Sequence, residues 1–302
     1  MSGLLLGLVL ALLASVFLNG SYLLQHGGAA DAPKITPRHP IASFRGLLTS
    51  RLWLAGAAVG TAGWAMHITA LTMTPLSLVQ AFLAGGLALV VPLAARAMHQ
   101  PMGRMELMAV GLMTLALVGL TIGLDRVGDH HNFTTGPMAA YLGIAAALSL
   151  LLLLVGGDRR SHALGLAGGI LYGAADVAIK ALTGIGEDRG FVKVLVSPWL
   201  LVAIATSLGA FFFFQRGLQT GRALPVIALM TAGTNVVSIV GGFFVFGDPL
   251  GATTALSILH SACFVLVGVA AWLLAPAQAA FTAPGAEGES PPAAPAQPAP
   301  VH

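Results

Sequence analysis

The chain is 302 residues long, with 8% charged residues, 57% hydrophobic residues and a formal net charge of +3. Soluble domains carry about 25% charged residues, so this composition excludes a soluble globular protein and makes the lipid bilayer its surroundings. The 14 lysines and arginines are scattered along the chain rather than gathered in a stripe, which argues against a nucleic-acid partner.

Apolar runs long enough to cross a bilayer recur up to about residue 275. Because a spanning helix needs about 20 apolar residues, we predict an all-α polytopic membrane protein with about nine transmembrane helices. The first run has no basic segment before it and no obvious cleavage site, so we interpret it as a retained helix rather than a signal peptide. The predicted spans are 3–24, 52–72, 76–97, 104–124, 136–156, 162–183, 197–216, 222–245 and 252–274.

Basic residues predict the orientation of these spans, because Lys and Arg are retained on the cytoplasmic side. One set of alternate loops and loop ends holds ten of them, and the opposite set holds three. We therefore expect the N-terminus outside and the C-terminus in the cytoplasm, in a cell or inner membrane. The ten are Lys34, Arg38, Arg45, Arg51, Arg96, Arg104, Arg159, Arg160, Arg216 and Arg222, and the three are Arg126, Arg189 and Lys193.

Two links resemble each other, Gln-Pro-Met-Gly at 100–103 and Asp-Pro-Leu-Gly at 248–251. Similar Ser- and Trp-containing segments open the second and seventh spans, so spans 1–4 match spans 6–9. Five spans separate equivalent helices, and because five is odd the two halves cross the membrane in opposite directions. We predict a 4+1+4 inverted repeat. Its parts are a first repeat (1–135), a linking helix (136–161), a second repeat (162–274) and a disordered Pro/Ala-rich cytoplasmic tail (275–302).

Asp176 is the only acidic residue predicted deep inside a span, where an ionised carboxylate costs about 2.5–3.5 kcal/mol unless it is paired or hydrated. Lys180 follows one turn later on the same helix face. Gly165, Gly169 and Gly173 share this face, which is typical of a seam along which another helix packs closely. We expect Asp176 to couple transport or anchor a substrate, with Lys180 balancing its charge. The alternative is a structural ion pair whose lysine reaches the outer surface.

Further polar residues inside predicted spans are candidates for lining a translocation path. Unpaired polar groups are costly in hydrocarbon, so these side chains require partners or water. For each of them the alternative is a hydrogen bond between helices, and a lone membrane histidine is more often structural than a ligand. The candidates are Asn19 and Ser21 in span 1, His67 in span 2, Gln80 in span 3 and Asn235 in span 8.

Motifs of soluble enzymes are missing from the sequence, which has no P-loop, HExxH, CxxC or nucleophile elbow. We therefore predict no catalytic residues, no cofactor and no metal centre. The single cysteine, Cys263, has no partner for an intramolecular disulfide. Glycine-rich helix faces pack within a chain as readily as between chains, which leaves a homodimer open.

Four features carry a family resemblance: LASVFLNGSYLLQHG in the first span, Trp53 with the Gly-rich span after it, TPLSLVQAFLAGG entering the third span, and ALPVIALMTAGTNVVSIVGGFFVFGDPL across the eighth. With them the chain resembles the drug/metabolite transporter superfamily, and within it the NIPA-like and EamA-like branches. The resemblance implies alternating access by nine or ten helices. It implies magnesium or other divalent cations as cargo in the first branch and amino acids or other metabolites in the second. The lysine beside the single deep carboxylate counts against a dication.

We therefore expect a secondary transporter that moves a small polar or amphiphilic metabolite or cation by alternating access. A NIPA-like transporter of Mg²⁺ is the alternative within this class. A non-transporting membrane scaffold or regulatory subunit is the alternative from another class. A membrane enzyme acting on lipids requires a cluster of acids, histidines or a nucleophile near one interface, which the sequence lacks.

Overall fold

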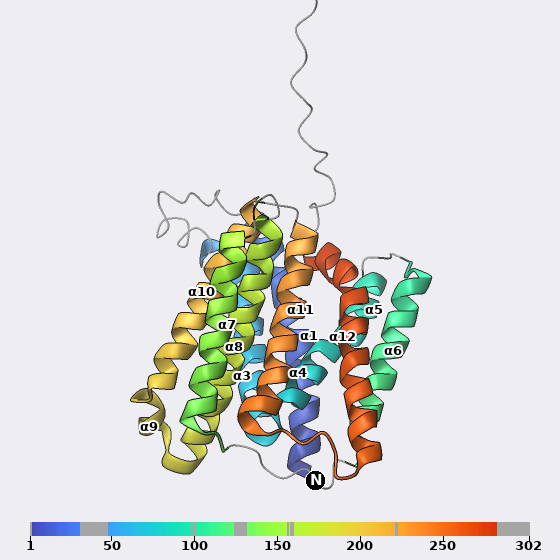
Figure 1. Cartoon of the computed structure of the whole chain (residues 1–302). Coiled ribbons are helices and arrows are strands. Elements are labelled where there is room, and N and C mark those ends of the chain that lie inside the picture. Colours follow the sequence, from blue (N-terminus) through green and yellow to red (C-terminus); the bar gives the residue numbers. More distant parts are fainter. Residues whose placement is uncertain are drawn as a thin grey trace, which may run out of the picture.

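A computed structural model describes residues 2–30, 48–97, 99, 101–123, 132–155, 157, 160–220 and 223–282. These residues form helices joined by short turns and contain no strand. The long helices stand side by side in one bundle (Figure 1). In chain order they are α1 (Ser2–Ala30), α3 (Arg51–Met73), α4 (Leu76–Gly85), α5 (Leu87–Ala97), α6 (Arg104–Leu120), α7 (Thr135–Val155), α8 (Arg160–Arg189), α9 (Phe191–Leu195), α10 (Pro198–Thr220), α11 (Ala223–Gly241), the π-helical turn η3 (Gly242–Phe246) and α12 (Thr254–Thr282).

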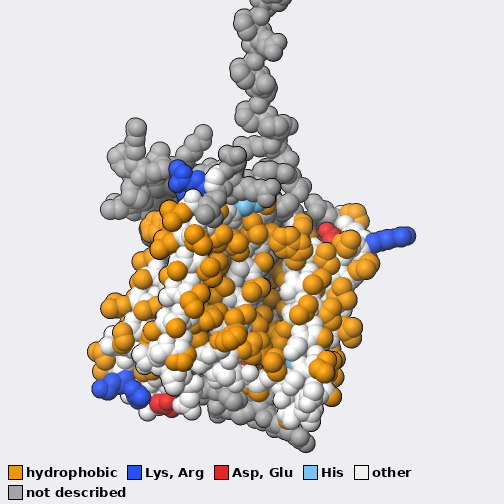
Figure 2. All heavy atoms as spheres, viewed as in Figure 1, with side chains coloured by type: hydrophobic (Ala, Val, Ile, Leu, Met, Phe, Trp, Pro, Cys, Tyr) orange, Lys and Arg blue, Asp and Glu red, His pale blue; other side chains and the backbone are white. Residues whose placement is uncertain are grey.

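Among the described residues, seven helical segments are long and apolar enough to cross a membrane. In addition, α10 contains the shorter apolar segment Pro198–Phe214, and α6 has 17 residues. Figure 2 shows hydrophobic side chains covering the sides of the bundle, while Lys and Arg lie toward its two ends. The predicted all-α membrane protein is confirmed, and the count of nine spans stays a prediction. The seven segments are Gly3–Ser21, Arg51–Met73, Leu76–Arg96, Thr135–Leu154, Arg160–Arg189, Pro225–Phe246 and Thr254–Gln278.

The third and eighth predicted spans are each interrupted at a pair of glycines. In the third, α4 ends at Gly85 and α5 begins at Leu87. In the eighth, α11 ends at Gly241 and continues as η3. Both are local irregularities in otherwise continuous helical segments, Leu76–Arg96 and Pro225–Phe246.

Helix α8 is enclosed by α3, α7, α10 and α11. Its glycines allow this close packing: a Cβ atom added to Gly165 would lie 2.7 Å from the carbonyl oxygen of Val226 in α11. One added to Gly169 would collide with the backbone of Met230. The glycine seam predicted from the sequence is therefore confirmed, and α11 is the helix that uses it.

Helix α12 extends beyond the end of the ninth predicted span at residue 274 and reaches Thr282. Pro276 lies inside the helix and removes one backbone donor. The flanking residues Ala275, Ala277 and Gln278 are buried, so packing against neighbouring helices stabilises this turn. Residues 275–282 are thus helical rather than part of the predicted tail. Residues 283–302 lie outside the described residues.

Candidate functional site

Four helices bring polar side chains together around Asp176 of α8. The Oδ2 atom of Asp176 accepts hydrogen bonds from Gln80 Nε2 of α4 at 2.8 Å and from Ser238 Oγ of α11 at 2.9 Å. The Nε2 atom of His67, on α3, lies 3.4 Å from Gln80 Nε2. We call Asp176, Gln80, Ser238 and His67 the Asp176 cluster. Three of its members, Asp176, His67 and Gln80, were predicted site residues, and the structure brings them together.

The cluster is enclosed by the bundle. Gln80 and Ser238 have 0% exposure and His67 has 6%, while Asp176 is half-buried. An isolated carboxylate is costly in such surroundings, and hydrogen bonds from neighbouring donors offset part of that cost. The other atom of the Gln80 amide, Oε1, makes no hydrogen bond within the part of the chain that the structure describes. The cluster therefore presents a carboxylate and an amide oxygen in one buried place.

Lys180 is bonded to the end of α3. The sequence predicts that it balances the charge of Asp176, one turn away on the same helix. In the structure its Nζ donates hydrogen bonds to the carbonyl oxygens of Leu71 at 2.5 Å and Thr74 at 3.0 Å. The physical reason is that the carbonyl end of α3 carries partial negative charge and unsatisfied acceptors. Lys180 thus ties α8 to the end of α3.

The two candidates on α1 lie apart from the Asp176 cluster. Asn19 Oδ1 accepts a hydrogen bond from Gln278 Nε2 of α12 at 2.8 Å, and Asn19 Nδ2 donates to the carbonyl oxygen of Ser15 at 2.8 Å. Ser21 Oγ donates to the carbonyl oxygen of Leu18 in its own helix at 2.7 Å. Asn19 therefore connects α1 to α12, which is the interhelical role that the sequence left open.

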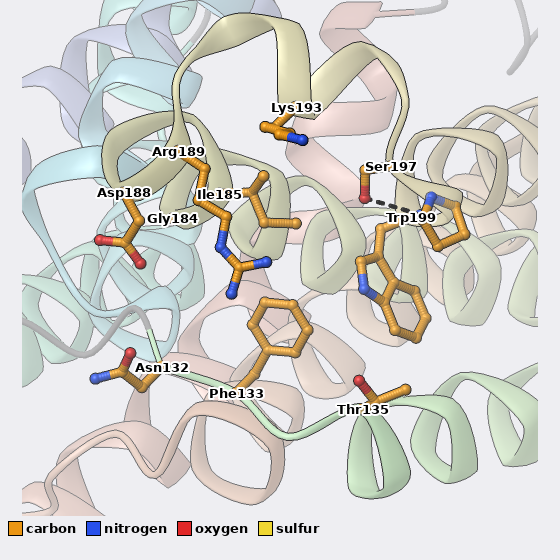
Figure 3. A pocket seen from close by; sticks show the side chains of 11 residues that line it. Asn132, Phe133, Thr135, Gly184, Ile185, Asp188, Arg189, Lys193, Ser197 and Trp199 are labelled. Carbon is orange, nitrogen blue, oxygen red and sulfur yellow. Dashed lines mark hydrogen bonds between the residues drawn. The ribbon is translucent and has the colours of Figure 1, made fainter.

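A cavity of about 300 Å³ lies at the other end of α8 (Figure 3). It begins at Gly184, about two helical turns beyond Asp176. Phe133 and Trp199 form its aromatic wall in an edge-to-face contact with ring centroids 6.0 Å apart. This cavity is separate from the Asp176 cluster. Its lining residues are Asn132, Phe133, Thr135, Gly184, Ile185, Asp188, Arg189, Lys193, Ser197, Pro198 and Trp199.

Metal-binding groups of the kind that hold a resident ion are not found among the described residues, which contain no group of three or more His, Cys, Asp or Glu placed to share a metal. Cys263 is a buried free cysteine. The Asp176 cluster supplies one carboxylate, one imidazole, one amide and one hydroxyl. That set suits a transient ligand better than a tightly held ion, because structural metal sites use several charged or imidazole ligands at once.

The sequence aligns with two curated proteins over most of its length. It is 24% identical to a protein of Arabidopsis thaliana named probable magnesium transporter NIPA9, over 280 residues that cover 86% of this chain and 79% of that protein. Over most of its length the chain is therefore similar to a NIPA-type protein. It is also 24% identical to an uncharacterised protein of Corynebacterium glutamicum, over 249 residues that cover 81% of this chain and 86% of that protein. No family profile and no solved structure matches.

This similarity supports the expectation of a membrane transporter. The resemblance noted from the sequence is thereby confirmed for the NIPA-like branch. The Asp176 cluster lies between α4 and α11, each of which reaches its glycine irregularity a few residues later.

Sequence reasoning missed Ser238 of the NIPA-like chain and chose Asn235 instead. Asn235 lies one turn earlier on α11, and its Nδ2 is buried without a hydrogen bond among the described residues. A serine inside an apolar run gives a weak signal, because serines in membrane helices often bond to their own backbone. Gln278 was missed because the ninth span was ended at 274. Asp248 was noted only as part of the link 248–251 and was not selected as a candidate. In the structure its side chain is buried, with 5% exposure.

Proposed function

We propose that this protein is a secondary cation transporter that works by alternating access, with Asp176 as the residue that meets the cation. One observation carries the proposal: a carboxylate in the middle of α8 is held between Gln80 of the first predicted half and Ser238 of the second. A site shared by two halves changes its access when the halves rock against each other.

The proposal includes nine spans in two inverted halves, with the N-terminus outside. Helix packing supports it. Helix α1 packs along α3 as α8 packs along α10, which matches the first two helices of each half. In addition, α4 packs against α11 and α6 against α12, which joins each helix to its equivalent in the other half. Such contacts are expected of a pseudo-twofold axis that passes between the third and fourth helices of the halves.

The placement of Lys180 favours a cation as the cargo. The sequence alone counted this lysine against a dication, because an ammonium beside the carboxylate would repel it. In the structure the ammonium is held by two carbonyl oxygens of the α3 end. The carboxylate of Asp176 and the free Oε1 of Gln80 then remain as oxygen ligands.

Magnesium is our first candidate for the cargo. Mg²⁺ prefers oxygen ligands, dehydrates reluctantly and usually binds through one or two carboxylates while keeping several waters. The single carboxylate of the cluster fits a partly hydrated Mg²⁺, and the name of the Arabidopsis relative points the same way. The second candidate is a small metabolite that carries an ammonium group, because one carboxylate flanked by an amide and a hydroxyl also matches a single positive charge.

Purified protein in liposomes that contain a magnesium-sensitive dye tests the proposal. We expect Mg²⁺ influx in the wild type and a fall of about tenfold or more in Asp176→Asn, because the site loses its only negative charge while its shape is kept. The matched control is Asp188→Asn, the same change at an exposed position of the same helix, which should transport at the wild-type rate.

Equal Mg²⁺ influx in the wild type and in Asp176→Asn would contradict the role of Asp176. If the wild type moves no Mg²⁺ but exchanges a labelled amine, and Asp176→Asn abolishes that exchange, the ammonium metabolite is the cargo. Flux of neither substrate class would contradict the proposed cation transport.

A further inference from the structure

The turn between α3 and α4 is buried, although connecting turns normally lie on the surface. Thr74 has 2% exposure, Leu76 has 0% and Ser77 has 1%, and Pro75 is buried as well. The turn lies at the end of the bundle where α1 begins, because Thr74 Oγ1 donates a hydrogen bond to the carbonyl oxygen of Leu4 at 3.4 Å. The predicted orientation places this end outside.

On its α3 side, the turn is bonded to the ammonium group of Lys180 from α8. Lys180 Nζ donates to the carbonyl oxygens of Leu71, in the last turn of α3, and of Thr74, which follows the helix end. The last carbonyl groups of a helix have no partner within the helix and carry the negative end of its dipole. A buried ammonium therefore satisfies both the hydrogen bonds and the charge of the α3 end.

On its α4 side, the turn is bonded to the carboxylate of Asp248, which follows η3. Helix α4 begins after Pro75, which offers no side-chain cap. Asp248 Oδ2 accepts the hydrogen bond of the Ser77 backbone N–H at 2.7 Å, and a carboxylate is favourable at the positive end of a helix. Gly242 allows the approach, since a Cβ there would lie 2.8 Å from Ser77 N.

Both charges come from the second predicted half, whereas the turn belongs to the first. Lys180 has 1% exposure and Asp248 has 5%, so separating either from the turn leaves a buried charge without these bonds. Both contacts are also close to the Asp176 cluster along the chain: Lys180 lies one turn after Asp176, and Ser77 lies three residues before Gln80.

We propose that Lys180 and Asp248 form a clamp that keeps the outer gate of the transporter closed, and that the α3–α4 turn is this gate. The clamp also positions Gln80 and His67 against Asp176, because these two residues lie on the helices that the turn connects. Opening toward the outside requires the turn to leave both charges. This inference rests on the proposed alternating access and identifies the residues that govern one side of it.

Thiol labelling of the full chain in liposomes tests the gate without any transport assay. The reporter is Ser77→Cys in a Cys263→Ala background, because the Ser77 hydroxyl makes no hydrogen bond among the described residues and sulfur replaces it with little change. A membrane-impermeant maleimide is applied separately to each side. We expect slow labelling with the clamp intact and labelling about tenfold faster or more, from the outer side only, with Asp248→Ala or Lys180→Met.

Rescue and a second reporter separate gating from loss of structure. Asp248→Asn keeps an acceptor oxygen for Ser77 N, so it should label more slowly than Asp248→Ala. Ala277→Cys reports on the opposite end of the bundle, where Ala277 has 7% exposure. Release of the clamp should leave the labelling of Ala277→Cys unchanged or slower. General destabilisation would instead make the labelling of both reporters faster. Asp188→Ala serves as the control for loss of an exposed acid near the same end of the bundle.

Unchanged labelling of Ser77→Cys in both clamp variants would overturn the gate, and so would faster labelling of both reporters. If either occurs while Asp176→Asn still abolishes transport, the gate is wrong and the proposed function stands. If the clamp behaves as expected but no cation is transported, the proposed cargo is wrong and the gate stands.

Discussion

At the residue scale, the chemistry of this protein depends on which partner each buried polar side chain finds. Asp176 and Lys180 are one helical turn apart, yet the carboxylate bonds to side chains of α4 and α11 while the ammonium bonds to the backbone at the end of α3. A buried charge is stable only where its hydrogen bonds are satisfied. Each of these two charges thus ties α8 to a different neighbour.

Ser238→Ala removes one of the two hydrogen bonds that the Asp176 carboxylate accepts from described side chains, and it keeps the shape of the helix. We expect a fall of about threefold to tenfold in transport rate, smaller than that of Asp176→Asn, because a hydrogen bond between membrane helices is worth about 1 kcal/mol. The transport rate is measured as the initial rate of cation influx into liposomes that contain each variant. Ser149→Ala is the control, since Ser149 is equally buried but donates to backbone oxygens of α7 and α8. An equal loss in both variants would show a general packing effect.

At the element scale, small residues decide how closely the helices approach. The glycines of α8 place its backbone against that of α11, and this contact brings Ser238 within reach of Asp176. A helix pair with larger residues at these positions would stand farther apart. The irregular positions between α4 and α5 and between α11 and η3 lie in helices that contribute to the proposed site.

Gly169→Ala should destabilise the protein, because the added methyl group would collide with the Met230 backbone and push α11 away from α8. Overpacking of this kind costs about 1–3 kcal/mol, so the midpoint of thermal unfolding in detergent should fall by several degrees. In Gly143→Ala the new methyl group meets nothing within 4 Å, and alanine favours the helix. A thermal midpoint as high in Gly169→Ala as in Gly143→Ala would argue against the seam.

At the scale of the whole molecule, two sets of polar contacts lie at different depths of the bundle. Lys180 and Asp248 close the turn at the end where α1 begins, and Asn19 with Gln278 joins α1 to α12 farther along α1. The Asp176 cluster is a third set, contributed by both predicted halves. Rocking of the halves would exchange these contacts at the ends while it keeps the cluster near the axis.

The proposed inverted repeat requires the two similar links, 100–103 and 248–251, to lie on opposite sides of the membrane. With Cys263→Ala as background, Pro101→Cys and Ala252→Cys place thiols at exposed positions of the two links. An impermeant maleimide should label the first only from the cytoplasmic side and the second only from outside. Labelling of both positions from one side would contradict the inverted arrangement and the proposed direction of gating.

Much of the site was predictable because single residues stand out against an apolar background. Asp176, Gln80 and His67 were selected for their cost in hydrocarbon, and the structure joins them. Ser238 and Asp248 were not selected, because a serine inside an apolar run and an acid in a link are common. Asn19 and Ser21 were selected on the same cost argument, yet their hydrogen bonds lie elsewhere.

The sequence by itself determined the all-α membrane architecture, the place of the apolar spans and the NIPA-like relationship, since length, hydropathy and local motifs are properties of neighbouring residues. Only the tertiary structure decided which helices face each other, and hence that Lys180 bonds to the α3 end and Asp248 to the α4 start. The physical reason is that helical periodicity assigns a residue to a face of its own helix, whereas its partner is chosen by packing between helices distant in the chain.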